Sequence, residues 1–379
     1  MRLGMGVSAW ARGLLAGHID GIGVYTENLW LEHCRNNVSP HAVAFGVLDE
    51  VKVRQEAPRP LECLPGKFSA NSAFSIITGL PYLGSGGLRS KIDVFHAPDH
   101  HIPKLRSVPV VATIMDAIPI VHPEWVSANL RRTKNAVFRQ TVKWAEHVIT
   151  ISEYSKADIV EFYGVCEQDI TVIPLGYDES LCPRLGQNEN TAVLQKYLLN
   201  EGYFLFVGTL QPRKNVRRII QAHRALSPAI RAAHPLIIVG AYGWGSDDLL
   251  RDIEEMEREG FGRWLKWVSK SDLKALMQSA TALVYPSLYE GFGLPILEGF
   301  AAQIPVISSS TTSIPEVAGE AALLVDPVRV DEISDAMAKV AENTGLAADL
   351  VSRGKEQLER YSWASCAQQT REVCQRYSA

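Results

Sequence analysis

Two glutamates, Glu290 and Glu298, stand eight positions apart on either side of a glycine-rich turn that leads into a predicted helix. The start of a helix leaves backbone N–H groups unpaired, and the helix dipole adds partial positive charge there. Gly291 and Gly293 carry no Cβ atom, so a phosphate group can approach these N–H groups directly. The segment is therefore predicted to bind an anion, with one carboxylate before it and one after it.

The two carboxylates favour a nucleotide sugar as that anion. Glu298 is expected one turn into the helix beyond Leu294, where its oxygens can accept hydrogen bonds from the two adjacent hydroxyl groups of a ribose. Glu290 precedes the turn and is expected to face the group that the phosphate carries. Phe292, between the two glycines, belongs to the same predicted donor site.

A second cluster of candidate ligands follows the apolar run 203–207, which is predicted to be a strand. Arg213 and Lys214 lie between this strand and a predicted helix, and ligands of open α/β sheets bind at the carboxyl ends of strands. Arg suits a forked contact to phosphate oxygens, and Lys supplies a compact charge. Together they would neutralise a departing nucleoside diphosphate; an exposed basic loop is the alternative. The donor site is predicted to include two further residues, Gly208 and Val268.

These motifs resemble glycosyltransferase family 4, a family of retaining enzymes. The resemblance rests on the glutamate spacing, on Tyr-Pro-Ser-Leu-Tyr-Glu-Gly-Phe-Gly-Leu-Pro at 285–295, and on the G-x-x-x-x-R-K-N pattern at 208–215. It implies a GT-B fold, with two Rossmann-like domains facing across a cleft. It also implies transfer of a sugar, mannose as the first choice, from a nucleoside-diphosphate sugar to a glycan or polyprenyl-linked acceptor of a surface polysaccharide.

The resemblance also implies roles for residues in the first half of the chain. Gly21 and Gly23 stand where the family has a glycine loop that faces the donor phosphate, although such a pair can also form a plain turn. Asp116 matches the family's H-D-x-x-P segment, whereas Met115 replaces its histidine. The implied catalytic residues are Glu290, Arg213, Lys214 and Asp116.

Several candidate acceptor-side residues follow another predicted strand: His96, Asp99, His100 and His101. One of these histidines can supply the hydrogen bond that Met115 lacks, although an ordinary core or surface role is the alternative for each. Three histidines beside an aspartate also suggest a metal, but no further ligand pattern supports one. The chain has no D-x-D sequence, so we expect a metal-independent enzyme without a cofactor.

The order of predicted elements is that of an α/β protein. Short β-branched runs alternate with helical patterns in both halves, among them a helix predicted at 128–145 and a strand predicted at 265–267. This alternation predicts two parallel sheets covered by helices. Turn residues without a period at 176–200 mark the break between the halves. We therefore predict an acceptor-binding domain at 1–180 and a nucleotide-sugar-binding domain at 181–360. By resemblance, the helix within 361–379 is expected to cross back to the first domain.

Charge and hydropathy restrict the partners. A net charge of −4 argues against nucleic acid. Residues 102–145 nevertheless contain seven basic and two acidic residues, a local charge of +5 beside Trp125 and Trp144. This segment is either a contact with anionic lipid or an ordinary solvated helix face. No apolar run is long enough to span a membrane and the N-terminus does not resemble a signal peptide, so we expect a cytoplasmic protein, peripheral at the inner membrane face if the segment binds lipid.

Two other functional classes fit the same motifs. A non-catalytic subunit that binds a nucleotide sugar is consistent with Met115, and a nucleotide-sugar epimerase of GT-B type would share the fold. The complete set of Arg213, Lys214, Glu290 and Glu298 favours a transferase over both.

Overall fold

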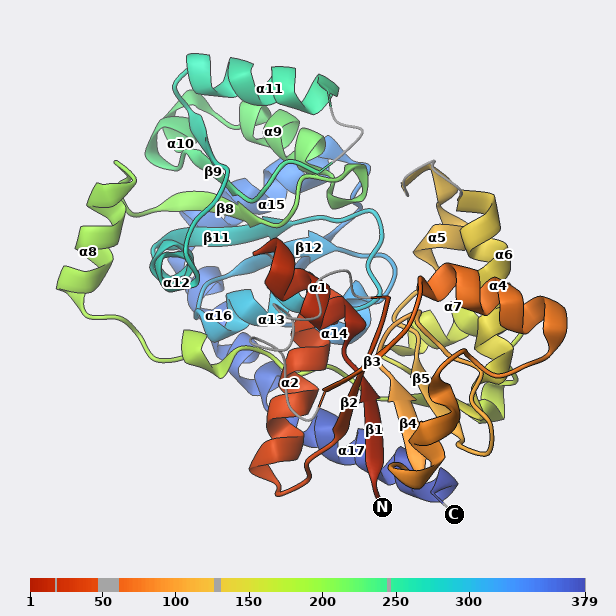
Figure 1. The fold of residues 1–379 in the computed structure, drawn as a ribbon. Helices are drawn as coiled ribbons and strands as arrows, with labels where there is room; N and C mark the ends of the chain where they lie inside the picture. The colour runs from red at the N-terminus through yellow and green to blue at the C-terminus, as the bar shows by residue number, and fades with distance from the viewer. Residues whose placement is uncertain (18, 47–60, 126–130, 244–246, 379) are drawn as a thin grey trace. The chain divides into compact units, whose positions relative to one another are not determined.

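The computed structural model describes residues 1–379 except 18, 47–60, 126–130, 244–246 and 379. The chain forms two compact units, one made of Met1–Gly176 with Ser362–Ala379 and the other of Tyr177–Tyr361 (Figure 1). The chain passes from the first unit to the second after Gly176, at the start of the break predicted at 176–200. Each unit is a parallel sheet covered by helices.

The first unit contains a seven-stranded parallel sheet with the order β3-β2-β1-β4-β5-β6-β7. Its strands are β1 Leu3–Gly6, β2 His41–Phe45, β3 Leu61–Leu64, β4 Val94–Ala97, β5 Val110–Thr113, β6 His147–Thr150 and β7 Ile170–Val172. All strands are parallel, but from β1 the order leads through β2 and β3 to one edge of the sheet, and from β4 it leads through β5 and β6 to β7 at the other edge. The strand order therefore reverses between β1 and β4, the place where sheets of this kind bind ligands.

Helices of the first unit connect these strands. Its α-helices are α1 Ser8–Ala16, α2 Gly21–Arg35, α4 Phe68–Thr78, α5 Ile118–Val121, α6 Arg131–Thr141, α7 Glu153–Tyr163 and α17 Trp363–Tyr377. Its 3₁₀ helices are η1 Ser85–Ser90, η2 Pro123–Trp125, η3 Val142–Trp144 and η4 Glu167–Asp169. The helix predicted at 128–145 is thus α6 followed by η3, and residues 128–130 lie outside the described residues.

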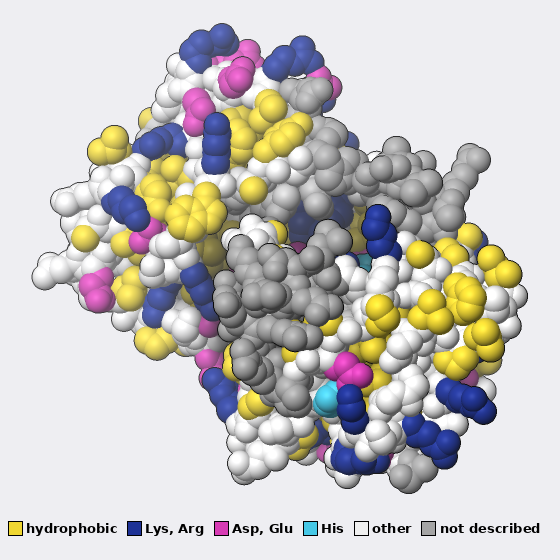
Figure 2. All heavy atoms as spheres, in the orientation of Figure 1, with side chains coloured by type: hydrophobic (Ala, Val, Ile, Leu, Met, Phe, Trp, Pro, Cys, Tyr) yellow, Lys and Arg dark blue, Asp and Glu magenta, His cyan; other side chains and the backbone are white. Residues whose placement is uncertain are grey.

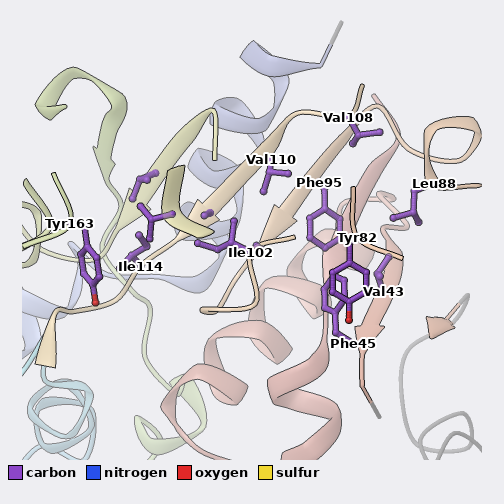
Figure 3. Packing of buried hydrophobic residues seen from close by; sticks show 14 of the residues in the cluster. Val43, Phe45, Tyr82, Leu88, Phe95, Ile102, Val108, Val110, Ile114 and Tyr163 are labelled. Carbon is purple, nitrogen blue, oxygen red and sulfur yellow. The ribbon is translucent and has the colours of Figure 1, made fainter. Parts of the chain in front are cut away.

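Burial of apolar side chains on one side of this sheet stabilises the first unit. Phe45, Phe95 and Tyr82 pack edge to face, with Phe45 5.1 Å from Tyr82 and 6.1 Å from Phe95 between ring centroids (Figure 3). Ile102 and Ile114 extend the same cluster, both at most 2% exposed. Burying each such side chain contributes roughly 1.5–3 kcal/mol, so this cluster fixes the strand ends that carry the candidate residues.

The terminal helix α17 packs on α2 and β4, within the first unit. Its residues Trp363, Cys366 and Cys374 are buried. Gly176 is the last residue before the chain enters the second unit. It lies so close to α17 that a Cβ atom on it would be 2.2 Å from the backbone nitrogen of Trp363. Only glycine fits this contact.

Two buried histidines lie near the helices α2 and α17. Arg371 of α17 donates a hydrogen bond of 3.2 Å to Nδ1 of His33, and His96 Nε2 lies 2.8 Å from Thr113 Oγ1. Burial, with the charge of Arg371, lowers the pKa of His33 to about 4. Burial, with the nearby His33, lowers the pKa of His96 to about 3. Both histidines are therefore neutral at pH 7 in the folded protein.

These histidines should make the first unit sensitive to acid. Unfolded histidine has a pKa near 6.5, so below that pH the unfolded chain binds two protons that the folded chain excludes. The free energy of unfolding should fall by about 1.4 kcal/mol per pH unit for each histidine between about pH 6 and pH 4. Denaturant titrations of wild-type protein and His33→Gln at several pH values measure this, and the slope of the variant should be shallower. Replacing the exposed His100 with Gln is the control; equal slopes in all three proteins would contradict the argument.

The second unit contains a six-stranded parallel sheet with the order β10-β9-β8-β11-β12-β13. Its strands are β8 Tyr203–Val207, β9 Leu236–Val239, β10 Gly262–Leu265, β11 Ala280–Tyr285, β12 Val306–Ser309 and β13 Leu323–Val325. Its helices are η5 Glu179–Leu181, α8 Gln187–Lys196, η6 Pro212–Lys214, α9 Val216–Ala225, α10 Pro228–Ala233, α11 Asp247–Arg258, α12 Lys270–Gln278, α13 Leu294–Ala301, α14 Ile314–Ala318, α15 Val330–Glu342 and α16 Thr344–Leu358. The strand order of this sheet reverses between β8 and β11.

Two predictions from the sequence are wrong in this unit. The strand expected at 265–267 is β10, which covers Gly262–Leu265 in register with β9, and Trp267 is 74% exposed in the loop beyond it. The break at 176–200 was expected to lack regular structure but contains α8. Gly186 caps this helix together with Glu189, whose carboxylate accepts a hydrogen bond of 3.1 Å from the Gly186 N–H.

No helix in the described part of the chain is long and apolar enough to cross a membrane.

Candidate functional site

The loops that follow β8 and β11 bring together the charged residues of the two sequence motifs. Arg213 and Lys214 lie in η6, which follows β8. Glu290 follows β11, and the backbone N–H of Leu288 donates a hydrogen bond of 2.8 Å to the carbonyl of Arg213, which joins the two loops. The cluster therefore occupies the point where the strand order reverses, as expected for a ligand site.

Glu290 is held by both cations. Arg213 donates to Glu290 Oε2 at 2.8 Å, and Lys214 Nζ donates to Glu290 Oε1 at 2.7 Å. Tyr285 donates to the same Oε1 at 2.9 Å, and Lys214 also contacts the Tyr285 hydroxyl. The carboxylate and the lysine are both buried. These contacts fix the orientation of all four side chains.

The charges in this cluster are strongly coupled. Burial alone would raise the pKa of Glu290, but the adjacent Arg213 and Lys214 lower it to about 2. Burial lowers the pKa of Lys214 to about 8, against the opposing effect of Glu290. Burial raises the pKa of Tyr285 well above its ordinary value, so this hydroxyl stays neutral. At pH 7 the cluster holds two cations and one anion, a net positive charge suited to a phosphate group.

Neighbouring polar side chains hold the turn at Glu290. Ser313 Oγ donates to the Glu290 carbonyl at 2.8 Å, and the Glu290 N–H donates to Thr312 Oγ1 at 3.3 Å. Asn215 donates to the carbonyl of Pro286 at 2.9 Å. Thr312, Ser313 and Tyr285 carry no signal for a ligand site in the sequence. Thr312 and Ser313 end a run of Ser and Thr residues at 308–313, and Tyr285 ends an apolar run.

Glu298 lies within α13, which begins after Gly293. Gly293 has a φ of +113°, a conformation that favours glycine, and no side chain caps this helix start. Burial, with the nearby Asp178, raises the pKa of Glu298 to about 7. Asp178 itself forms an ion pair of 2.8 Å with Lys270. Glu298 is therefore partly protonated at neutral pH.

The other residues predicted for the donor site take different positions. Gly208 has a φ of +149° directly after β8, and Gly240 packs against its backbone. Phe292 is buried and its ring lies 5.7 Å from that of Tyr361, so only its backbone is placed at the turn. Val268 is half-buried in the loop after β10. Two more predicted residues, Gly291 and Leu294, lie in the turn and at the first position of α13.

The glycine pair of the first unit forms the first turn of α2. The Asp20 carboxylate caps this helix and accepts a hydrogen bond of 2.8 Å from the Gly23 N–H. Gly21 is exposed, whereas a Cβ atom on Gly23 would lie 2.5 Å from a methyl carbon of Ile19. The expected approach of a phosphate to the Gly23 N–H thus competes with an aspartate that already occupies it.

Asp116 and His96 lie at neighbouring strands of the first unit. Asp116 follows β5, is half-buried, and accepts a hydrogen bond of 3.0 Å from the Ile118 N–H. His96 lies within β4 and is fully buried against Tyr25 and Thr113. A core position of this kind explains His96 without any contact to an acceptor.

Asp99 and His101 form a hydrogen-bonded pair after β4. His101 Nδ1 lies 2.8 Å from Asp99 Oδ2, and the His101 N–H donates to Asp99 Oδ1 at 2.8 Å. Both residues are buried, while His100 is exposed with its ring 4.4 Å from that of His101. Despite its burial, the hydrogen bonds from His101 and the proximity of His100 hold the pKa of Asp99 well below its usual range. Within the described ranges, no group of three or more His, Cys, Asp or Glu side chains is arranged to hold a metal ion.

Comparison with known proteins places the chain in a family. Residues 19–181 match the family described as Glycosyltransferase Family 4, and residues 191–357 match Glycosyl transferases group 1. The chain is 35% identical to O-antigen chain mannosyltransferase B of Escherichia coli over 73% of this chain and 72% of that protein. It is 30% identical to O-antigen chain mannosyltransferase RfbU of Salmonella typhimurium over 71% and 69% of the two chains. The protein belongs to glycosyltransferase family 4 and is a glycosyltransferase.

Solved structures share its fold. Anabaena Alr3699/HepE, solved in complex with UDP and glucose, aligns with a TM-score of 0.75 at 18% identity, covering 99% of this chain and 100% of that one. The lipopolysaccharide glycosyltransferase WaaG aligns with a TM-score of 0.73 at 15% identity, covering 98% and 99%. Two Rossmann-like domains of this kind define the GT-B fold, as predicted from the sequence.

Proposed function

We propose that this protein transfers mannose from a nucleoside-diphosphate sugar, with retention of configuration, to a glycan or polyprenyl-linked acceptor in the synthesis of a surface polysaccharide such as an O-antigen. The observation that carries the proposal is the cluster of Arg213 and Lys214 around Glu290 at the strand ends of β8 and β11. The choice of mannose rests on the two relatives named as O-antigen mannosyltransferases.

In this proposal the buried cluster binds the donor and stabilises the leaving group. Arg213 and Lys214 donate to the diphosphate oxygens, where negative charge develops as the bond from the sugar breaks. Glu290 faces the sugar and is kept ionised by the two cations. Glu298 accepts hydrogen bonds from the ribose. The leaving phosphate takes the proton of the acceptor hydroxyl. Asp116 is a further catalytic residue in this proposal, as the family resemblance implies.

Release of free GDP from GDP-mannose tests this function. Incubation of the protein with GDP-mannose and a mannose-containing lipid-linked glycan should release GDP and lengthen the acceptor by one residue. A protein that binds GDP-mannose without releasing GDP would instead be the non-catalytic subunit. An epimerase would change the sugar without an acceptor.

Metal removal should leave activity largely unchanged. We propose that Arg213 and Lys214 supply the positive charge that a divalent ion supplies in other glycosyltransferases, so chelation removes nothing from the site. Initial rates with and without EDTA measure this. Complete loss of activity in EDTA that manganese or magnesium restores would contradict it.

We propose a cytoplasmic protein that attaches peripherally to anionic lipid through the first unit. The last turn of α4 and the loop after it expose Ile76, Ile77 and Leu80, with Ile77 83% exposed. Figure 2 shows hydrophobic side chains gathered in this region at the right of the view. Helix α4 packs against the basic helix α6. Apolar side chains beside a basic helix are typical of surfaces that contact lipid headgroups.

Vesicle binding should depend on salt and on the basic residues of α6. If Arg131, Arg132, Lys134 and Arg139 contact anionic lipid, each contributes roughly 1 kcal/mol near the surface, and salt screens that attraction. Replacing all four with Gln should abolish sedimentation with phosphatidylglycerol vesicles and spare turnover on a soluble acceptor. Replacing exposed Arg89 in η1 is the matched control. A wild-type protein that ignores anionic vesicles at low salt would rule out the attachment.

A further inference from the structure

The sheet of the first unit reverses its strand order, as does the sheet of the second unit where the cation cluster lies. The reversal lies between β1 and β4 in the first sheet and between β8 and β11 in the second. Ligands of open α/β sheets bind outside the carboxyl ends of strands at such a reversal. The side chains that follow β1 and β4 are therefore candidates for a second substrate contact.

Three side chains meet at this position. Arg12 lies in α1, directly after β1, and its guanidinium is 2.9 Å from His101 Nε2. His101 and Asp99 follow β4, and His101 Nδ1 is 2.8 Å from Asp99 Oδ2. A guanidinium only donates hydrogen bonds, so Nε2 must accept and Nδ1 must carry the proton that is donated to Asp99. The aspartate thereby fixes the tautomer of the imidazole, and the imidazole fixes the position of the arginine.

Arg12 is the exposed member of this group of three side chains, and it is a cation. Asp99 and His101 are buried, whereas Arg12 is exposed. Arg12 contacts a neutral ring, and the described residues include no carboxylate within ion-pair distance of it. This differs from Arg213, whose guanidinium is paired with Glu290. A guanidinium keeps its charge at all relevant pH values, and its planar fork of N–H groups suits phosphate oxygens.

We propose that Arg12, positioned by His101 and Asp99, binds a phosphate group of a substrate. This inference rests on the proposed function, in which two substrates carry that chemistry: the diphosphate of the donor and the diphosphate of a polyprenyl-linked acceptor. Arg12 makes the contact, and His101 and Asp99 are positioning residues that hold it at the strand ends.

Binding of inorganic pyrophosphate tests the site without requiring sugar transfer. Calorimetry on the full chain saturated with GDP should detect pyrophosphate binding that Arg12→Gln weakens about ten- to a hundredfold, the loss expected for a charged hydrogen bond. The matched control is Arg89→Gln, an exposed arginine of the same unit in η1, which should bind like wild type. Equal affinities of wild type and Arg12→Gln for both pyrophosphate and GDP would overturn the proposal, whereas weaker binding of GDP alone by Arg12→Gln would assign the contact to the donor diphosphate. If GDP itself fails to bind, the donor assignment is wrong, while the Arg12→Gln comparison in the absence of GDP still decides this site.

Steady-state kinetics identify which substrate carries the phosphate. With GDP-mannose and a polyprenyl-diphosphate-linked glycan, a higher KM for the acceptor alone in Arg12→Gln assigns the contact to the acceptor. A higher KM for GDP-mannose alone assigns it to the donor. Unchanged KM values for both would contradict the site.

The positioning role has its own test. His101→Gln keeps a side-chain oxygen that can accept from Arg12 and should retain most of the pyrophosphate affinity, whereas His101→Leu should lose it. Melting temperatures of both variants show whether the fold is intact. If a folded His101→Leu binds pyrophosphate like wild type, His101 does not position Arg12.

Discussion

Replacing Lys214 with Ala should lower turnover by about two to three powers of ten, the loss found when one donor to a developing negative charge is removed. Lys214 Nζ is buried against Glu290 and Tyr285, so no solvent cation can take its place with the same geometry. Replacing Arg213 with Ala should have a similar effect on turnover. Initial rates at saturating donor measure both.

A matched control separates this effect from a general loss of charge. Arg217 lies three residues further along in α9, but its guanidinium pairs with Asp252 at 2.8 Å and is half exposed. Arg217→Ala removes a cation from the same region and should retain nearly full turnover. A double replacement of Arg213 and Lys214 that keeps the wild-type rate would disprove the assigned roles of both.

The affinity for GDP-mannose should follow a bell-shaped pH dependence with Glu298 responsible for its rising side. Glu298 has a pKa of about 7 and must be ionised to accept both ribose hydrogen bonds, so affinity should rise as the pH increases through 7. Lys214 has a pKa of about 8 and must be protonated to bind the diphosphate, so affinity should fall above that pH. Nucleotide-sugar binding is measured by calorimetry without acceptor, because the diphosphate of a nucleotide sugar does not titrate in this range.

Variants of Glu298 test the two sides of this profile separately. Glu298→Ala should weaken binding about tenfold to a hundredfold, because it removes charge-assisted hydrogen bonds present in both the bound and the transition state. Glu298→Gln should lose the rising side and keep the falling side. Unchanged nucleotide affinity in Glu298→Ala would exclude the ribose role.

The sequence predicts the charged residues of the site better than it predicts the residues that hold them in place. Arg213, Lys214 and Glu290 are charged residues in loops next to strong strand patterns, and such residues indicate a ligand site with few alternatives. Tyr285 completes the same cluster but ends the buried strand β11, where an aromatic residue is most often part of the core. Its contact with Glu290 becomes visible only when the two loops are placed beside each other.

Residue type also fails to separate the histidines of the first unit. His96, His100 and His101 stand within six positions, yet one lies in the core, one is exposed and one is held between Asp99 and Arg12. The different environments of these histidines depend on where β4 ends and on how α1 packs beside it. The sequence pattern locates the end of β4 but does not indicate the packing of α1. The sequence carries no separate signal for helix α1, because Ser8–Ala16 follows the first strand almost without a turn.

The strand predicted at 265–267 illustrates a different limit. The segment from Gly262 contains Trp264 and Trp267, and either aromatic residue is compatible with a strand. Pairing with β9 decides the register, because Gly262 lies opposite Leu236 where a Cβ atom would meet Met256. A long-range contact of this kind is absent from the local pattern.

The return of α17 to the first unit sets an order of events during synthesis. Residues 1–176 leave the ribosome first, but the surface of α2 and β4 that α17 covers stays open until Trp363–Tyr377 have been made. At about 5–20 residues per second, translation of the intervening second unit takes roughly ten seconds or more. During that time the nascent first unit lacks one of its own helices, and the surface of α2 and β4 is covered only when α17 emerges.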